Sequence, residues 1–252
     1  MRKLSLLLLG GAWLLMGLDC GEKPTSLNLR AFVKDQGASL MLMWDVAENG
    51  TGYVIYADDN VLDTITDPEI TEYYLDSTHV CKVVRVIALG SDLTGTLDLT
   101  PVYDTVTLYE YDAGASGLVF DAGGHPTVYN AKTDSSSRGQ IQLVLMDTLA
   151  DGVDPASFRL VSPNEALISG KKTGFAPLGG PLAPPPNDSL YATHTDYLAS
   201  GQAWAVWLGD NLFTYDLKND NFVGVGVVSV GDSSAVLATA YQLFNGLRWI
   251  TW

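Results

Sequence analysis

Residues 39–58, SLMLMWDVAENGTGYVIYAD, decide how the first part of this chain folds. An apolar run ends at Trp44, a polar turn that contains two glycines follows, and a second apolar run begins at Tyr53. This pattern predicts two strands joined by a turn. Because side chains alternate between the two faces of a strand, Leu40, Leu42 and Trp44 share one face. We expect that face to point into a core, with Trp44 as its anchor.

Short apolar runs recur along residues 25–110 at intervals of roughly ten residues, as in an all-β domain. Turn residues separate them, and no long segment has a helical period. Besides the two strands named above, we expect strands at residues 27–31, 61–65, 70–75, 80–89 and 96–108. Seven short strands with this spacing are typical of a β-sandwich.

Several of these residues form a pattern that is seen in a known family. The carriers are Pro24, Leu27 and Leu29 in the first strand, Trp44 in the second, GYVIY at residues 52–56 and VRVIA at residues 84–88. On this pattern, residues 25–110 resemble a fibronectin type III domain. The resemblance implies a seven-stranded sandwich that acts as a spacer or binding module. Lys82 stands where such domains usually carry a tyrosine.

Residues 118–252 also hold short apolar runs and predict a second β-rich domain, which a glycine-containing linker at residues 111–117 separates from the first. Residues 222–230, FVGVGVVSV, are apolar on both parities, as expected for a strand buried on both faces. Residues 235–244 suit a helix by composition, but their length between two glycines and their β-branched and aromatic content favour a strand. Further strands are expected at residues 118–120, 127–129, 141–146, 158–161, 203–208, 212–215 and 247–252.

A second resemblance rests on four stretches: GLVFD at residues 117–121, GQAWAVW at residues 201–207, FVGVGVVSV at residues 222–230 and AYQ at residues 240–242. They are similar to a C-terminal β-rich domain of secreted bacterial lipoproteins, some of them HmuY-like haem-binding proteins. The resemblance implies fold and compartment. We therefore expect an all-β chain, in which a fibronectin type III-like sandwich is followed by a second β-sandwich-like domain.

The glycine- and proline-rich residues 174–186, GFAPLGGPLAPPP, are expected to form a surface loop. Proline cannot donate a hydrogen bond to a neighbouring strand, and glycine weakens a strand interior. Recognition of a partner by a polyproline conformation of residues 184–186 is the alternative.

Residues 1–19 have the pattern of an export signal, because two basic residues precede an uncharged apolar run at residues 4–18. This run is too short to span a membrane comfortably. Cys20 and a polar tether at residues 20–24 follow. The arrangement resembles a bacterial lipoprotein signal, which implies lipidation of Cys20, although Asp19 departs from the small residue expected there. We expect a protein of the cell envelope or the extracellular space that touches a membrane only through this anchor.

Two cysteines are present, and their pairing has two interpretations. If Cys20 is lipidated, Cys81 is a lone thiol in an apolar run, which indicates a small buried side chain. A disulfide between Cys20 and Cys81 is the alternative in an oxidising compartment.

Charge is lopsided, with 14 basic against 29 acidic residues and a net charge of −15. Such a surface repels phosphate backbones and anionic lipids, so a nucleic-acid partner is not expected.

Signatures of catalytic and metal sites are missing from the sequence. The histidines His79, His125 and His194 have no zinc-like spacing, and neither a G-x-S-x-G elbow nor a phosphate-binding loop occurs. A meeting of His125 and His194 as axial haem ligands is a minor alternative. The acids Asp58-Asp59, and Asp216 with Asp220, fit turns better than a calcium site. We expect a protein without catalysis, metal or cofactor.

Aromatic side chains are crowded in the last quarter of the chain. Trp204, Trp207, Tyr191 and Tyr197 are the candidate contacts for a sugar ring or a protein partner. Trp204 and Trp207 differ in parity and point to opposite faces of an unbroken strand, so at least one belongs to a core. The competing interpretation is that these aromatics fill the second sandwich.

Together these features predict a non-catalytic exported protein that binds a surface protein or a glycan, with the first domain as spacer and the second as contact module. Two alternatives remain open. The second domain captures a small ligand, glycan or haem, or the chain is a structural subunit whose exposed β edges pair in an assembly.

Overall fold

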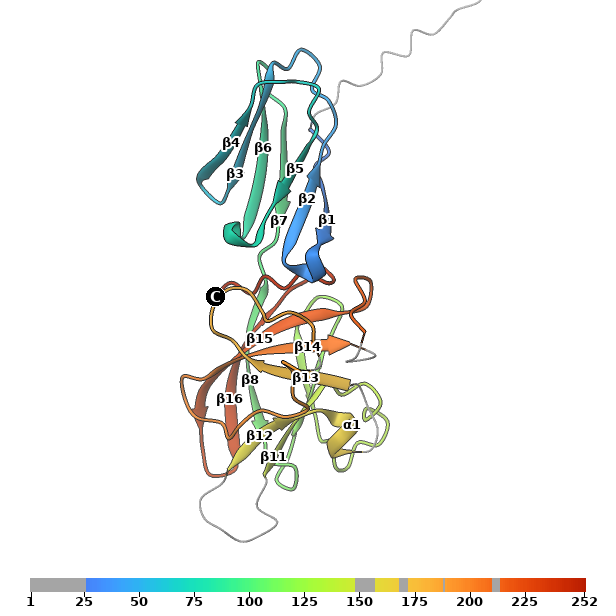
Figure 1. Cartoon of the computed structure of the whole chain (residues 1–252). Coiled ribbons are helices and arrows are strands. Elements are labelled where there is room, and N and C mark those ends of the chain that lie inside the picture. The colour runs from blue at the N-terminus through green and yellow to red at the C-terminus, as the bar shows by residue number, and fades with distance from the viewer. Residues whose placement is uncertain (1–25, 148–156, 168–171, 188, 210–213) are drawn as a thin grey trace, which may run out of the picture.

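The computed structural model describes residues 26–147, 157–167, 172–187, 189–209 and 214–252, which are built almost entirely from antiparallel strands (Figure 1). The prediction of an all-β fold is confirmed. Two sandwiches are stacked end to end, which we call the N-terminal and the C-terminal sandwich. The expected export signal, the tether and Cys20 lie outside the described residues. Within the described ranges, no helix has the length and apolar character needed to cross a bilayer.

The N-terminal sandwich packs a three-stranded sheet on a four-stranded sheet. The first has the order β1 (Arg30–Lys34), β2 (Ser39–Met43), β5 (Glu72–Leu75), and the second has the order β4 (Asn60–Ile65), β3 (Gly52–Ala57), β6 (Val83–Leu89), β7 (Thr94–Asp98). Two 3-10 turns, η1 (Asp35–Gly37) and η2 (Ser77–His79), connect strands at one end.

Trp44 anchors the core of this sandwich, as predicted. Leu40, Leu42 and Trp44 are at most 2% exposed and pack with side chains of both sheets. The Trp44 ring meets Tyr53 edge-on, with centroids 5.2 Å apart. The Tyr53 hydroxyl accepts a hydrogen bond from the Ala47 N–H at 3.0 Å and donates one to the Pro68 carbonyl at 3.1 Å. One aromatic pair therefore joins the two sheets.

The connection between the two strands of residues 39–58 differs from a simple hairpin. β2 pairs with β1 and β5, whereas β3 pairs with β4 and β6. Residues 44–51 thus cross from one sheet to the other, because both strands turn their apolar faces to the same core from opposite sides.

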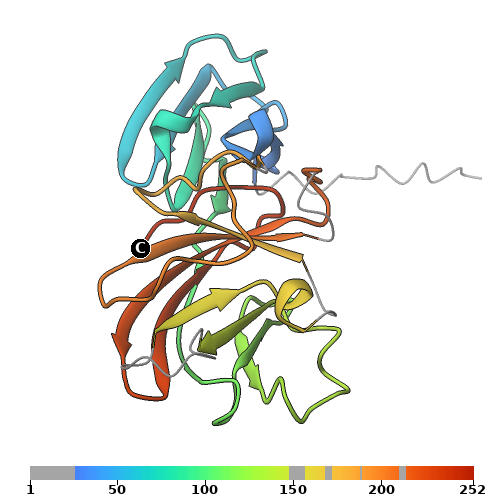
Figure 2. The ribbon, with the colours of Figure 1, turned by 60° about the horizontal axis from the view of Figure 1, so that its bottom comes forward.

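The C-terminal sandwich packs a five-stranded sheet on a four-stranded sheet, and Figure 2 shows these two layers. A short helix, α1 (Pro163–Ala166), lies beside β11 and β13. The larger sheet has the order β13 (Lys172–Pro177), β14 (Ala203–Gly209), β15 (Asn221–Val230), β16 (Ser234–Tyr241), β8 (Val102–Tyr109). The smaller has the order β10 (Pro126–Tyr129), β9 (Gly117–Phe120), β11 (Leu143–Asp147), β12 (Phe158–Val161).

Strand β8 lies in the larger sheet of the C-terminal sandwich, although its residues fall within the expected first domain, 25–110. The single strand expected at residues 96–108 is divided at Pro101, since proline has no N–H for a ladder. β7 pairs with β6, and β8 pairs along its whole length with β16. The chain therefore passes from one sandwich to the other at residues 99–101.

The loop expected at residues 174–186 begins later than predicted. Residues 172–177 form β13, and Phe175 and Ala176 are buried at 1% exposure. β13 is an edge strand of its sheet, a position where Pro177 is tolerated.

Three predicted strands near the C-terminus have different outcomes. Residues 247–252 form no strand and make one isolated bridge, Leu182 with Trp249. Residues 214 and 215 are not in a strand, and residues 210–213 lie outside the described ranges. Residues 234–241 form a strand, β16, which confirms the prediction of a strand instead of a helix in this region.

Residues 247–250 lie between the two sandwiches. Leu247 and Trp249 are fully buried in the N-terminal core, and Ile250 is fully buried on the larger C-terminal sheet. Between them, the Arg248 Nε donates to the Gln36 carbonyl at 2.8 Å, and the Trp249 Nε1 donates to the Ala38 carbonyl at 2.9 Å. These contacts fix the η1 turn of the N-terminal sandwich on the C-terminal one.

We predict that Trp44→Ala lowers the free energy of unfolding by about 3–5 kcal/mol, because it empties a core site and removes the partner of Tyr53. Urea denaturation followed by circular dichroism measures this loss. Val46→Ala is the control, since Val46 is 53% exposed and should change stability little. Equal losses in the two variants would contradict the role of Trp44.

Cys81 is predicted to be unreactive in the folded protein. It is buried at 3% exposure, and burial, with a smaller contribution from Asp58, raises the pKa of its thiol to about 12. A Cys20→Ser variant isolates this thiol, which should react with a thiol reagent at pH 8 only after unfolding in urea. In the unreduced wild-type chain in urea, a Cys20–Cys81 disulfide would leave no reactive thiol.

Candidate functional site

Three of the four expected ligand contacts are buried, which corrects the prediction for them. Trp204 is 6% exposed, Trp207 1% and Tyr191 6%. Their opposite parity is confirmed, because Trp204 lies in the core between the sheets and Trp207 lies on the other face with Tyr191, at 5.4 Å between ring centroids. None of these three rings offers a free face to a ligand. Both tryptophans are therefore packing residues.

Tyr197 is exposed, at 49%, but one face of its ring is occupied. The guanidinium carbon of Arg159 lies 4.1 Å from the ring centroid. This cation–π contact accounts for the position of Tyr197 without a ligand.

Two cross-strand rows on the outer face of the larger C-terminal sheet consist mostly of very small side chains. One cross-strand row runs Ala176, Ala205, Gly224, Ala240 and ends at Tyr103, and the next row runs Ala203, Gly226, Ala238, Thr105. Since these side chains rise little above the sheet, there is room for chain segments to lie directly on the backbone. Residues 248–250 do so, bonded to residues 181–183.

Trp252 lies against this small-residue face. A Cβ atom at Gly224 would come within 2.5 Å of Ile250 Cγ2 and 2.9 Å of Trp252 Cζ2, and one at Gly226 within 3.6 Å of Trp252 Cη2. Glycine at position 224 is therefore a requirement of the packing. Without it, neither Ile250 nor the indole reaches the sheet.

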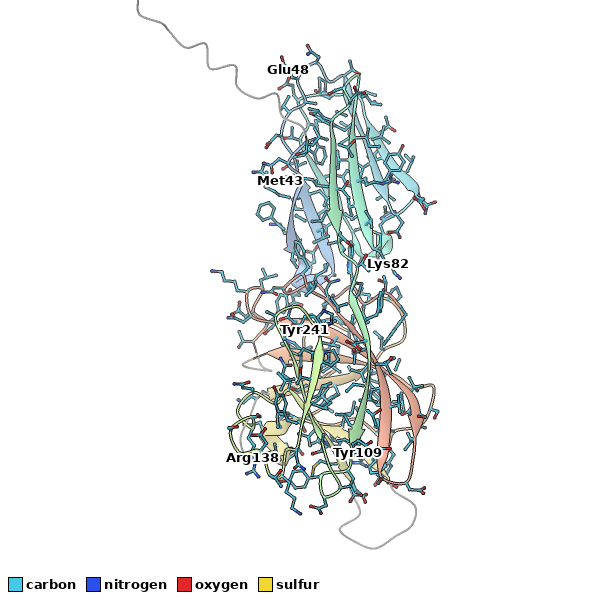
Figure 3. The ribbon with its side chains drawn as sticks, turned by 180° about the vertical axis from the view of Figure 1, so that it is seen from behind. Met43, Glu48, Lys82, Tyr109, Arg138 and Tyr241 are labelled. Atoms are coloured by element: carbon cyan, nitrogen blue, oxygen red, sulfur yellow. The ribbon has the colours of Figure 1, made fainter. Side chains whose placement is uncertain are left out.

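Polar contacts fix the backbone beside this indole. The Tyr103 hydroxyl donates to the Thr251 carbonyl at 2.7 Å. The Lys82 Nζ, from the N-terminal sandwich, donates to the Trp252 carbonyl at 3.2 Å and lies 5.1 Å from the centroid of the Tyr103 ring. Figure 3 places Lys82 at the level where the two sandwiches meet. Lys82 thus supplies a contact between the sandwiches.

An open trough of about 440 Å³ results, which we call the aromatic trough. It is lined by Tyr103, Asp104, Thr105, Ala238, Thr239 and Trp252. The walls are aromatic and half exposed, 42% for Tyr103 and 50% for Trp252. Pairing with Ala238 puts Thr105 on the same face as Tyr103. The Asp104 carboxylate points to the opposite face, where it lies 3.6 Å from His125 Nδ1.

This arrangement suits a ligand with flat apolar faces and hydroxyl edges. Aromatic rings stack on such faces, and the Thr105 hydroxyl both donates and accepts hydrogen bonds. Charge is not gathered in the trough, since the nearby Lys82 is engaged at its edge. This site is not predicted from the sequence, because its two walls, Tyr103 and Trp252, are 149 positions apart and meet only through the sheet. The alternating glycines in residues 222–230 are the sequence feature that indicates it.

The histidines and paired acids do not form a metal site. Among the described residues, no group of three or more His, Cys, Asp or Glu side chains could hold an ion. His79, His125 and His194 each lie beside a different carboxylate, those of Asp76, Asp104 and Glu165. The acids act in turns, as Asp58 does by accepting the Lys82 and Val83 N–H groups at 2.9 Å.

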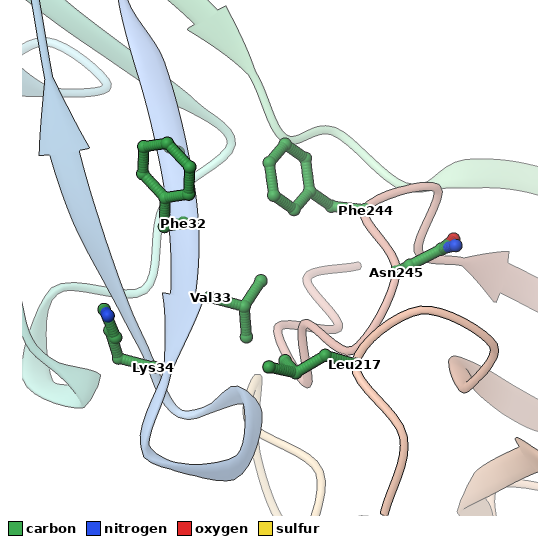
Figure 4. A pocket seen from close by; sticks show the side chains of 7 residues that line it. Phe32, Val33, Lys34, Leu217, Phe244 and Asn245 are labelled. Carbon is green, nitrogen blue, oxygen red and sulfur yellow. The ribbon is translucent and has the colours of Figure 1, made fainter.

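A second groove, of about 370 Å³, runs along the edge of β1 where the sandwiches meet (Figure 4). Its lining includes Phe32, Val33, Leu217 and Phe244, with Lys34 and Asn245 at the rim. Because apolar side chains dominate this lining and polar groups do not converge in it, it offers less specificity than the aromatic trough.

Comparison with known proteins assigns no family to the chain. No family model matches it, and no curated protein is significantly similar to it. Among solved structures, it is similar to a DUF4466 family protein from Parabacteroides merdae ATCC 43184, with 11% identity over 87% of this chain and 99% of that chain and a TM-score of 0.36. At this score the similarity identifies neither a site nor a function.

We predict that Gly224→Val displaces Ile250 and Trp252 from the sheet, because the added side chain occupies their positions. The free energy of unfolding should fall by roughly 1–3 kcal/mol, as in other overpacked sites. Acrylamide quenching of tryptophan fluorescence should increase. Gly180→Ala is the control, since a Cβ there meets no atom within 4 Å. Unchanged quenching in Gly224→Val would contradict this packing.

Proposed function

We propose that this chain is a non-catalytic exported binding protein of the cell envelope that takes a carbohydrate in the aromatic trough. The observation that carries the proposal is the pair of half-exposed rings, Tyr103 and Trp252, on a sheet face of small residues. Aromatic walls of this kind stack on the apolar faces of sugar rings, and Thr105 supplies a hydrogen-bonding group beside them. An acidic chain with a net charge of −15 suits a neutral sugar better than an anionic one.

The N-terminal sandwich serves in this proposal as a spacer of the fibronectin type III kind. Its sheet orders, β1-β2-β5 and β4-β3-β6-β7, support the resemblance. β1 begins at the pole away from the C-terminal sandwich and ends at η1, which contacts Arg248 (Figure 1). If lipidated Cys20 anchors the chain, the trough-bearing sandwich is held away from the membrane.

Haem capture, the other small-ligand alternative, receives less support. The three histidines lie in different parts of the fold, each beside a different carboxylate, and none of them lines the trough. Carbohydrate therefore remains the ligand class that the exposed groups fit best.

The experiment is a glycan array on the purified protein, followed by calorimetric titration of any bound glycan. Trp252→Ala and Tyr103→Ala should each weaken binding about tenfold, which corresponds to a loss of about 1.4 kcal/mol. Tyr197→Ala is the matched control, because Tyr197 is equally exposed but lies outside the trough. Thermal unfolding confirms that each variant is folded. Binding that survives both trough variants, or a loss in the control alone, would refute the assignment.

A further inference from the structure

The outer face of the three-stranded sheet β1-β2-β5 carries large apolar side chains that are partly exposed, and one of them, Phe32, also lines the groove beside Phe244. Phe32, Met41 and Tyr74 form one cross-strand row, because Met41 is the register partner of both others. Phe32 is 49% exposed and Tyr74 47%, and Met43, in the next row, is 36% exposed. Figure 3 shows Met43 on the outside of the N-terminal sandwich, clear of the C-terminal one. We call these four side chains the apolar stripe.

Charges on either side of the apolar stripe are sorted by sign. Arg30 and Lys34, both exposed, lie on the β1 side. Glu72 is exposed on the β5 side, and Asp76, whose side chain is 49% exposed, follows β5 on the same parity. Arg30 and Glu72 are both register partners of Met43, so they stand at opposite ends of one row. Positive groups thus lie on the β1 side of the apolar stripe and negative groups on the β5 side, while Asp35 and Asp45 lie at its two ends, where Asp35 accepts hydrogen bonds from the Ser39 and Tyr74 hydroxyls and Asp45 contacts Arg30.

We propose that this face is a homodimer interface, with a two-fold axis that lies in the contact plane parallel to β2. Rotation about this axis exchanges the β1 side with the β5 side. Arg30 of one copy then faces Glu72 of the second copy, and Phe32 faces Tyr74. Met41 and Met43 face their own counterparts, as in any isologous contact.

Charge selects this axis over the other in-plane choice. An axis perpendicular to the strands would bring Arg30 of one copy onto the Lys34 region of the other, and like charges at a contact oppose association. Two carboxylates, Asp35 and Asp45, lie near the chosen axis. In each copy Arg30 is 2.9 Å from Asp45, and the neighbouring Lys34 and the hydroxyls of Ser39 and Tyr74 offset the charge of Asp35. A second copy of this chain is therefore the partner whose charges match the face.

The proposed interface and the aromatic trough share no residue, because the first lies on β1, β2 and β5 and the second on β8, β16 and Trp252. Two linked troughs would bind a repeating surface glycan with higher avidity than one. The inference about the dimer does not depend on the proposed function, and its test uses no glycan.

Sedimentation equilibrium of the purified protein between about 5 and 500 µM tests the proposal, a range that covers weak self-association. The wild-type chain should pass from monomer to dimer. Arg30→Glu and Glu72→Arg should each weaken dimerisation at least tenfold, because each creates two like-charge contacts. An equimolar mixture of the two variants should restore the dimer, since both contacts of the mixed dimer regain opposite charges. A folding defect would not produce this rescue.

Two further variants separate the apolar stripe from exposed apolar surface in general. Phe32→Ser should weaken the dimer, whereas Val61→Ser should not, because Val61 is 57% exposed on β4 of the other sheet. A chain that stays monomeric at 500 µM, or a dimer that is unchanged by Phe32→Ser and not rescued by mixing the charge variants, overturns the proposal.

Discussion

The structure depends on residues 247–250, which belong to two hydrophobic cores at once. Leu247 and Trp249 complete the base of the N-terminal core, while Ile250 covers the larger C-terminal sheet. Side chains of this segment alternate between the two cores as they would in a strand, although the segment is not part of a sheet. Its backbone contacts residues 181–183 and η1 instead. The η1 turn has left-handed backbone angles at Asp35, Gln36 and Gly37, and a Cβ at Gly37 would lie 2.1 Å from the Gly246 carbonyl oxygen. Backbone strain in η1 is thus offset by the contacts of the segment that lies on it.

The candidate binding site is an extension of the same junction. Trp252 is placed by the contacts that hold the preceding residues, and Lys82 and Tyr103 bind the carbonyl groups beside it from the two sandwiches. A ligand that stacks on this indole therefore touches a group whose position depends on both halves of the molecule. The two sandwiches, which were predicted from the sequence as separate domains, therefore share one set of interactions.

Local periodicity was sufficient to predict the strands and the anchor of the first core. Leu40, Leu42 and Trp44 alternate as a strand does. Residues 222–227 are apolar on both parities because both faces of this part of β15 are covered, whereas Val228 at its end is 54% exposed. The predictions that were wrong concerned features that depend on contacts between residues distant in the sequence. Glycine and proline in residues 174–177 argued against a strand, but pairing with β14 formed one. The sheet that a strand joins is equally invisible locally, as β2, β3 and β8 show. Trp204 and Trp207 were candidate ligand contacts because they are tryptophans. Their burial, and the half exposure of Trp252, depend on how the layers pack, which the local sequence does not indicate.

Because Leu247 and Trp249 are part of the N-terminal core and Arg248 meets Gln36 across 212 positions of sequence, this core is incomplete when only its own strands have been synthesised. The base of this core is filled only by Leu247 and Trp249, which emerge from the ribosome much later. Contacts of such long range slow folding, since a long loop must be ordered before they form. In a chain that crosses a membrane unfolded, Leu247 and Trp249 would already be present when folding begins. A chain folding as it is synthesised would expose the unfilled base of its first sandwich throughout elongation.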